Sequence, residues 1–568
     1  MAVSARNRVE EATNDAANKH CGCILYITVL VGLLAILVIT GQRLYVPSVP
    51  SFLFATTTQS NGVALPDLYE ASIAELQAGL HAGHFTSVDL VKAYFARIEE
   101  VNLKGPMLRA ILELNPSALE QAATLDRERK SEGARSPLHG IPILLKDNIA
   151  THSSEGMNTT AGSFSLLGSI VPEDAGVVKR LRKAGAIILG KGNMDEFAHF
   201  RGDNLPSGWS GRGGQNTNAY FPNGDPCGSS SGPGVATSIG LTTPTVGLTS
   251  RAGVIPISAH QDTVGPMARS ITDAAIVLSV IAGKDDNDNY TLAQPPRIPN
   301  YIEALNQNAL RGKRIGVPRR AFCNDTDIEE SVKMAFDRAL DIIRGLGATV
   351  VDPADLPSAG EIALSTNETI VTDVDFKACV RSLADLIKFN DDHPESEKPP
   401  QLEEQNMLIR SEATSGFDDA FYEALAFDEE LGKTRGIDAT LAAHQLDALV
   451  LPSVRFTITS PAAIAGYPIV TGMFVLCTRH VGRLISSTYK VPLDFYPDDV
   501  IIGSAGPTTF YPAPGIPFGL SFFGTAFTEF DLIGFGFAFE QRTKTRLKRK
   551  AFAAAIPKTQ LKDVMSQG

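Results

Sequence analysis

Two segments of this sequence carry residue types that can move a proton. Lys146 stands at the end of the apolar run 141–145, and residues 226–234 form a glycine- and serine-rich loop, PCGSSSGPG. A buried lysine loses its charge more readily, because low-dielectric surroundings disfavour the ammonium form. A neutral amine can accept the proton of a hydroxyl and so activate a nucleophile. The segments predict a serine-to-lysine proton relay; the alternatives are a solvated strand-end lysine and an ordinary flexible turn.

Helices and strands alternate around both segments. The predicted strands are short and apolar, and they span residues 141–145, 186–189, 348–351 and 446–451. The predicted helices begin at the capping residues Ser72 and Thr86 and also cover residues 116–130, 175–184 and a segment from 330 to Gly345. This rhythm of helix and strand predicts an α/β layer fold.

Six blocks of the sequence, in their order along the chain, resemble the amidase signature family. The blocks are LHGIPILLKDNIA at 138–150, AGAIILGKGNMDEFA at 184–198, the run 228–240, HQDTVGPMARSITDAA at 260–275, AAIAGYPIV at 462–470 and PGIPFGLSFFG at 514–524. Each block alone is a weak signal, whereas six in the right order are specific. The resemblance covers nearly all of residues 66–545.

The resemblance implies an α/β fold with a large mixed β-sheet covered by helices on both faces. It also implies hydrolysis of a carboxylic amide through an acyl-enzyme, without cofactor or metal, on a small-molecule amide substrate. By motif position, Lys146 would be the base, Ser229 the bridging serine in a cis peptide bond, and Ser230 a supporting hydroxyl. Pro233 departs from the family's pattern, because a small polar residue is common there.

The segment that should deliver the attacking serine is absent. In the family this serine lies about two dozen residues after the bridging serine, in a glycine-rich turn whose amides form the oxyanion hole. Here about 25 residues between Leu241 and Pro244 are missing from that pattern. The remaining local hydroxyls have the wrong spacing, and they belong to Thr242, Thr243, Thr249 and Ser250. No nucleophile is identified, and we expect the chain as written to be inactive and poorly stable.

Two further joints in the sequence are irregular. Residues 472–490 intervene where the family runs directly into a strand, and the chain looks shortened near 377–381. All three joints are sharp and lie within otherwise good matches. They suggest a mistaken gene model, in which coding sequence was removed after Leu241 and an intron was translated at 472–490. A transcript that encodes the chain unchanged across both joints would refute this hypothesis.

The composition is that of an ordinary globular protein, with 43% apolar and 20% charged residues. Nothing marks a linker between residues 66 and 556, so we predict one large amidase domain there. The net charge of −12 gives no support to a nucleic-acid partner. The six cysteines show no CxxC pair and no ligand spacing with histidine, which argues against a structural zinc site and a disulfide scaffold.

The N-terminus carries one targeting feature. Residues 23–40 read CILYITVLVGLLAILVIT without a charge, and at 1.5 Å per residue they span about 27 Å. We predict a cytosolic tail at 1–22, a transmembrane helix at 23–40 and a linker at 41–65. The preceding basic residues place the domain on the lumenal or extracellular side, and they are Arg6, Arg8 and Lys19. Four glycosylation sequons fit that side, at Asn158, Asn289, Asn324 and Asn367.

Three functions remain open from the sequence. The chain is a membrane-anchored amidase whose true product keeps the nucleophile, a pseudo-amidase that binds without catalysis, or the amidase subunit of a tRNA-dependent amidotransferase. The apolar span argues against the last, because its partners are soluble and intracellular. Trp209 and Arg212 either shape the site or pack under the serine loop, and His139 and His260 need not be catalytic. The sequence specifies neither the substrate nor the oligomeric state.

Overall fold

The computed structural model describes residues 64–237, 241–243, 246–322, 328–380, 382–454, 456–473 and 509–566. Residues 64–568 form one compact unit. The predicted tail, transmembrane span and nearly all of the linker lie outside the described residues, as do residues 474–490 of the suspected insertion. Within the described ranges, no helix combines the length and the apolar character that crossing a membrane requires.

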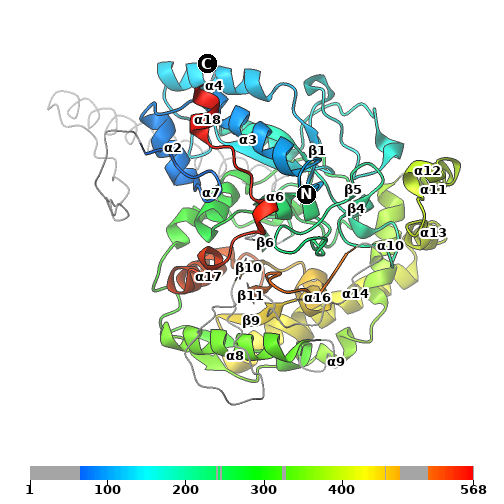
Figure 1. The fold of residues 1–568 in the computed structure, drawn as a ribbon. Coiled ribbons are helices and arrows are strands. Elements are labelled where there is room, and N and C mark those ends of the chain that lie inside the picture. The colour runs from blue at the N-terminus through cyan, green and yellow to red at the C-terminus, as the bar shows by residue number, and fades with distance from the viewer. Residues whose placement is uncertain are drawn as a thin grey trace, which may run out of the picture. The chain divides into compact units, whose positions relative to one another are not determined.

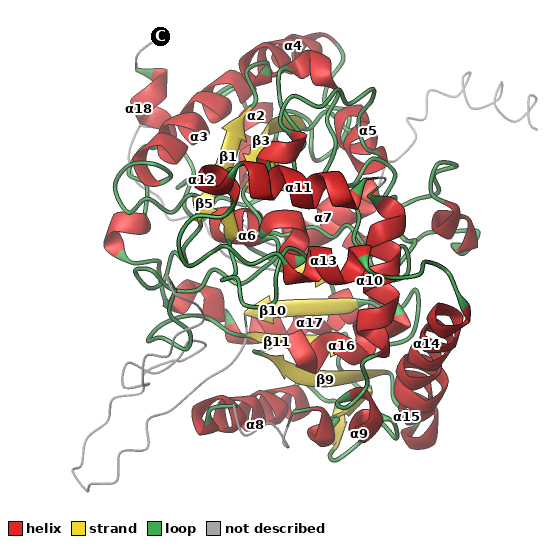
Figure 2. Cartoon of the chain, turned by 90° about the vertical axis from the view of Figure 1, so that its right-hand side faces the viewer, coloured by secondary structure: helices red, strands yellow, loops and turns green. Residues whose placement is uncertain are grey.

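The described strands fall into three sheets. They are β1 (Ile111–Leu114), β2 (Pro142–Lys146), β3 (Ile187–Gly192), β4 (Trp209–Ser210), β5 (Gly214–Gln215), β6 (Leu241–Thr243), β7 (Arg314–Gly316), β8 (Thr349–Val351), β9 (Ala448–Ser453), β10 (Ile469–Met473) and β11 (Gly519–Phe523). Three strands form a sheet in the order β1-β3-β2, six form a sheet in the order β6-β10-β11-β9-β7-β8, and β4 pairs with β5. Figure 2 shows β9, β10 and β11 side by side, apart from β1 and β3.

The α-helices surround these sheets (Figure 1). They are α2 (Ile73–His81), α3 (Ser87–Val101), α4 (Ala118–Ser131), α5 (Gly176–Lys183), α6 (Ser231–Thr237), α7 (Ile271–Ile281), α8 (Glu330–Gly345), α9 (Ala359–Ile362), α10 (Asn367–Cys379), α11 (Leu383–Asp392), α12 (Pro394–Glu397), α13 (Asn406–Glu412), α14 (Asp419–Glu429), α15 (Asp438–His444), α16 (Phe456–Ala465), α17 (Glu529–Thr543) and α18 (Leu561–Met565).

Apolar residues cover both faces of the three-stranded sheet. Ile187 and Leu189 of β3 pack with residues of α3 and α4, whereas Ile188 belongs to the large core that includes α5 and α7. This alternation follows from the two-residue period of a strand, which sends successive side chains to opposite faces. All six residues of β3 are buried, as a strand covered on both faces requires.

The six-stranded sheet carries the larger part of the core. Its strands contribute Ile315, Val450 and Leu520, which are fully buried among residues of α8, α16 and α17. The sheet is mixed, because β7 runs parallel to β8 and β9, whereas β9, β11, β10 and β6 pair antiparallel.

The elements confirm the predicted mixed α/β architecture. The capping boxes at Ser72 and Thr86 begin α2 and α3, and the apolar run before Lys146 forms β2. The family resemblance implied one large sheet. The described strands instead form separate sheets of six, three and two strands. Strands β2 and β6 are each the last strand of their sheet, and no described strand joins the two sheets.

The C-terminus closes on the N-terminal helices. Leu561 of α18 is fully buried in a cluster with Leu68, Leu80 and Leu90 (Figure 1). The Arg97 side chain donates a hydrogen bond of 2.7 Å to the carbonyl oxygen of Thr559. The packing of this unit therefore continues beyond residue 556, the end predicted for the domain.

Candidate functional site

The predicted base and the predicted bridging serine meet. Lys146 is the last residue of β2, and its Nζ lies 2.8 Å from the Oγ of Ser229, within hydrogen-bond distance. The two residues are 83 positions apart in the chain, so the fold and not local sequence brings them together. The contact provides the first step of a proton relay between a hydroxyl and an amine.

The surroundings of Lys146 favour a neutral amine. Burial lowers the pKa of Lys146 to about 8, although the carboxylates of Asp195 and Asp262 oppose this shift. The side chain is only partly exposed, because it lines a cavity beside β2. Roughly a tenth of the amine is therefore unprotonated at pH 7 and about half at pH 8, and this neutral form can accept a proton.

The serine loop is fixed by backbone contacts. The Gly228–Ser229 peptide bond is cis, the form that the family resemblance implies. The carbonyl oxygen of Ser229 accepts a hydrogen bond of 3.0 Å from the backbone N–H of Asp195. A Cβ atom at Gly228 would lie 2.1 Å from Oδ2 of Asp195, so only glycine fits at this position.

Asp195 is a positioning residue that the sequence did not single out. Its Oδ1 accepts a hydrogen bond of 2.6 Å from the backbone N–H of Gly208, and its Oδ2 lies 3.0 Å from Nδ1 of His199. The hydrogen bond to Asp195 raises the pKa of His199. The only sequence signal for Asp195 was its place in the second family block.

Helix α6 begins at Ser231, within the glycine- and serine-rich segment 226–234. The N–H of Gly232 donates a hydrogen bond of 2.8 Å to the carbonyl oxygen of Asn193, and a Cβ at Gly232 would lie 2.2 Å from the carbonyl oxygen of Ala110. Pro233, the departure from the family's pattern, is tolerated because the first helical turn leaves its backbone N–H groups without intrahelical partners. Ser230 lines the cavity, and its hydroxyl forms no hydrogen bond with a described residue.

Two of the four remaining local hydroxyls, those of Thr249 and Ser250, form hydrogen bonds away from Ser229. The Thr249 hydroxyl donates to the carbonyl oxygen of Val264 at 2.8 Å, and the Ser250 hydroxyl donates to Asp285 at 2.6 Å. Both side chains are fully buried. The side chains of Thr242 and Thr243 lie outside the description, and in the part of the chain that is described no second hydroxyl forms a hydrogen bond with Ser229 Oγ.

The other residues noted in the sequence have structural contacts. Trp209 is buried with Leu205 and Leu402, and Arg212 donates a hydrogen bond of 3.0 Å to Thr160. These contacts favour packing over a direct role at the lysine. Both histidines also form hydrogen bonds. Nε2 of His139 lies 2.9 Å from the carbonyl oxygen of Leu125, and Nδ1 of His260 lies 2.7 Å from the carboxylate of Asp375.

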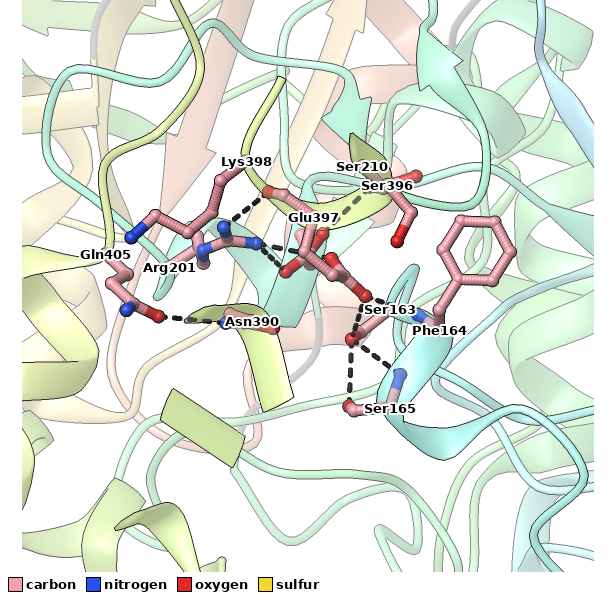
Figure 3. Close-up of polar contacts among 12 residues, drawn as sticks. Ser163, Phe164, Ser165, Arg201, Ser210, Asn390, Ser396, Glu397, Lys398 and Gln405 are labelled. Atoms are coloured by element: carbon pink, nitrogen blue, oxygen red, sulfur yellow. Dashed lines mark hydrogen bonds and ion pairs between the residues drawn. The ribbon is translucent and has the colours of Figure 1, made fainter. Parts of the chain in front are cut away.

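A buried ion network involves Glu196, the residue that follows Asp195. Arg201 is fully buried and forms ion pairs with Glu196 and Glu397. Figure 3 shows Glu397 in contact with Arg201 on one side and with Ser163 and Phe164 on the other. Burial raises the pKa of Glu196 to about 8, and the nearby Glu397 carboxylate adds to this effect. The network therefore shares one arginine between two carboxyl groups, and burial disfavours the charged form of Glu196.

The described residues offer no metal site, since their His, Cys, Asp and Glu side chains do not gather in a group of three that could hold an ion. What they do present is an α/β protein with a half-buried strand-end lysine that forms a hydrogen bond with a serine in a glycine-rich loop. That combination defines the class of hydrolases that use a serine and a lysine base.

The chain belongs to the Amidase family, whose model matches residues 89–244 and 239–533. It is 38% identical to an amidase-family protein of Arthroderma benhamiae, with 88% of this chain and 90% of that protein covered. It is 32% identical to a glutamyl-tRNA(Gln) amidotransferase subunit of Chloroflexus aurantiacus, over 85% of this chain and 99% of that protein. Among solved structures, the native peptide amidase from Stenotrophomonas maltophilia matches with a TM-score of 0.72 and 40% identity, over 86% and 99% of the two chains.

Proposed function

We propose that this chain carries the proton relay of an amide hydrolase but cannot complete the reaction as written. The observation that carries the proposal is the 2.8 Å contact between Lys146 Nζ and Ser229 Oγ at a lysine whose pKa is about 8. In the proposed reaction, neutral Lys146 takes the proton of Ser229, and Ser229 takes the proton of an attacking serine. The attacking oxygen then bonds to the substrate carbonyl carbon, the relayed proton returns through Ser229 to the amide nitrogen, and the amine leaves as the C–N bond breaks. Water, losing a proton to the same relay, then cleaves the acyl-enzyme ester, which releases the carboxylic acid and returns the proton to the serine.

The attacking serine belongs to the segment that we propose is missing after Leu241. The family model matches this chain in two segments, and their boundary falls at residues 239–244, which supports a break at this point. Without a nucleophile no acyl-enzyme forms. Loss of oxyanion-hole donors in the same segment would cost about 3–4 kcal/mol of transition-state stabilisation for each donor.

The proposed substrates are carboxylic amides of small molecules. The solved peptide amidase, which shares 40% of its aligned residues with this chain, makes peptide amides the first compounds to test. No cofactor is needed, because the lysine already supplies the base.

We also propose that residues 23–40 anchor the chain in a membrane, with the main domain on the lumenal or extracellular side. The support is the run of eighteen uncharged residues and the basic residues that precede it. Protease protection of the chain in sealed microsomes tests the orientation, and release of the chain by alkaline carbonate would contradict the anchor.

A pseudo-amidase that binds without catalysis is the second candidate. The absence of a second hydroxyl at Ser229 among the described residues favours it for the chain as written. The amidotransferase function has the support of a 32% identical relative, but residues 23–40 argue against soluble partners. Release of ammonia from glutamine only in the presence of partner proteins would favour that third function.

One experiment separates these candidates. The segment that the Arthroderma benhamiae relative carries between the counterparts of Leu241 and Pro244 is inserted into this chain, and hydrolysis of aryl, fatty and peptide amides is measured before and after insertion. We expect activity only after insertion, and Lys146→Ala in the restored chain should abolish turnover while the circular dichroism spectrum is retained. Activity of the unmodified chain, or of the restored Lys146→Ala variant, would overturn the proposal.

A further inference from the structure

A cavity of about 480 Å³ lies beside β2. Its wall includes every residue of β2, Val177 from α5, Val277 from α7, and Tyr94 and Ile98 from α3. Strand β2 is the last strand of its sheet, so one of its edges has no partner strand among the described residues. The cavity therefore coincides with an unpaired strand of the sheet.

Strand β2 has the sequence of a central strand but not the burial of one. Ile143 and Leu144 are partly exposed, as is Pro142, although the neighbouring β3 is buried along its whole length. A short, uninterrupted apolar run is typical of a strand that is covered on both faces and paired on both edges. The exposure of β2 is that of a central strand that lacks its neighbour.

The free edge of β2 presents backbone groups ready for pairing. The carbonyl oxygen of Ile141 accepts a hydrogen bond from Ile187 N–H, and Asp147 N–H donates one to Gly192, so these residues face β3. Since backbone groups alternate along a strand, the N–H and carbonyl groups of Leu144 point away from β3, toward the free edge. Such an edge is a template for another strand.

The side chains that line the cavity determine which kind of occupant fits inside it. Ile143 and Leu145 join the core cluster that contains Val177, whereas Leu144 joins a separate cluster with Ile98. An occupant strand would thus meet apolar side chains on both of its faces. At the carboxyl end of β2 the wall is polar, because Lys146 and Ser230 line it there.

Two polar atoms of the wall lack partners. Oδ1 of Asn148, a residue that is 9% exposed, and Oγ1 of Thr263 are buried and form no hydrogen bond. Buried polar groups are normally satisfied, so these atoms indicate a missing ligand with polar groups of its own. A peptide backbone supplies such groups, and a purely apolar ligand does not.

We infer that this cavity is a docking slot for one extended peptide strand, apolar on both faces and about as long as the five residues of β2. The strand pairs with the free edge at Leu144 and delivers its end toward Lys146 and Ser230. The inference rests on the proposed loss of the segment after Leu241, which lies at the boundary of the two family matches. A peptide with the sequence of the lost segment should therefore bind in trans.

The test uses the full-length chain in mild detergent. The probe is a fluorescein-labelled peptide with the Arthroderma benhamiae sequence between the counterparts of Leu241 and Pro244, with serine replaced by alanine, and a scrambled peptide is the control. We expect saturable binding by fluorescence anisotropy for the first peptide, with at least tenfold weaker binding of the second. Hydrogen exchange of the segment 141–147 should slow at least tenfold at the two amides that face the slot, those of Leu144 and Lys146.

A matched pair of variants tests the strand pairing. Leu144→Pro removes the N–H that faces the slot without removing a hydrogen bond to β3, and should weaken binding at least tenfold. Leu144→Ala keeps the N–H and should stay within about threefold of the original affinity. Equal binding by both variants would overturn the pairing, and hydrogen exchange of the unmodified chain decides the matter if Leu144→Pro does not fold.

The remaining outcomes separate this inference from the proposed function. Two outcomes would refute the slot and indicate a small-molecule pocket instead. In the first, the peptide binds but hydrogen exchange in β2 does not slow. In the second, a long-chain fatty amide displaces the peptide and hydrogen exchange in β2 does not change. Activity of the chain restored in cis, combined with no binding in trans, would refute the slot and leave the proposed function intact. Binding in trans combined with an inactive restored chain would support the slot and refute the proposed function.

Discussion

The backbone N–H of Asp195 donates a hydrogen bond of 3.0 Å to the carbonyl oxygen of Ser229. This bond ties the serine loop to the segment that follows β3, while Lys146 reaches the same serine from the end of β2. Ser229, the predicted bridging serine, is therefore positioned from two adjacent strands of one sheet. Its alignment with the lysine depends on the backbone of Asp195 and on the space that Gly228 leaves beside it.

Gly228→Ala should disable the relay in the segment-restored chain. The new Cβ would lie 2.1 Å from Oδ2 of Asp195, so either the loop or the Asp195 side chain must shift, and the alignment of Ser229 with Lys146 is disturbed. We expect kcat/KM for amide hydrolysis to fall at least 100-fold, because a shift of about 1 Å can cost that much. Gly234→Ala is the matched control, since a Cβ there meets nothing within 4 Å, and it should leave kcat/KM within about threefold. Equal losses in both variants would contradict a specific role of Gly228.

Stability should rise with pH between about 8 and 10. Burial lowers the pKa of Lys191 to about 8, as it does for Lys146, whereas an unfolded lysine titrates near 10.5. The unfolded chain therefore binds more protons in this window, and the free energy of unfolding increases as the pH rises, by at most about 3 kcal/mol for each lysine. Urea unfolding measured at pH 8, 9 and 10 tests this expectation.

The matched variant for this pH dependence is Lys191→Met. It removes one of the two titrating amines and should reduce the rise by roughly half. The two chains are compared below pH 10, because Tyr220 contributes above it. Burial raises the pKa of Tyr220 to about 12, so this phenol ionises first in the unfolded chain, which lowers the free energy of unfolding. A pH-independent free energy of unfolding from 8 to 10 would show that neither lysine is desolvated in the folded chain.

Arg201→Met should destabilise the fold strongly. The substitution leaves the carboxyl groups of Glu196 and Glu397 buried without their cation. Removing one partner from a buried ion pair costs about 3–5 kcal/mol, which urea unfolding at pH 7 would detect. Glu196→Gln is the informative comparison, because burial already disfavours the charged form of Glu196 and the neutral amide leaves no unpaired charge there, so it should cost less than about 1.5 kcal/mol. The reverse order of the two effects would contradict the cost that we assign to the unpaired carboxyl groups.

The restored chain should be far more stable than the chain as written. Apolar side chains of β2 such as Ile143 and Leu144 are partly exposed beside the cavity of about 480 Å³, and an inserted segment that covers them would stabilise the fold by about 25 cal/mol for each Å² of apolar surface removed from water. Thermal unfolding followed by circular dichroism should show a higher midpoint after the segment is inserted. An unchanged midpoint would indicate that the inserted segment does not occupy the cavity.

The contact between Lys146 and Ser229 could be anticipated because six family blocks follow in the right order, although the local signal of each residue is weak by itself. A lysine closes a short apolar strand, a glycine-rich loop holds the serine, and the order of the family blocks joins them. Asp195 gave no such signal, because it acts on Ser229 through a backbone N–H that every residue except proline possesses. The buried network of Glu196, Arg201 and Glu397 was equally hidden, since Glu397 lies about 200 residues further along the chain.

Helices and strands were predictable for a similar reason. The capping box that begins at Ser72 and the apolar run of β3 each depend on residues that are neighbours in the sequence. The division of the strands between two sheets was not predictable in this way, because pairing depends on distant segments. Strand β6 pairs with β10, more than 200 residues away, and only the three-dimensional arrangement shows that, among the described strands, β2 has no neighbour on its outer edge.

Trp209 is the only tryptophan of the chain, and its ring lies 5.5 Å from the guanidinium of Arg201 in a buried setting. Intrinsic fluorescence therefore comes from a single indole chromophore next to the carboxyl pair behind the serine loop. Solvent entry at that point would shift the emission maximum to longer wavelength. The emission of Trp209 thus reports local unfolding around Arg201, and no dye needs to be attached to follow it.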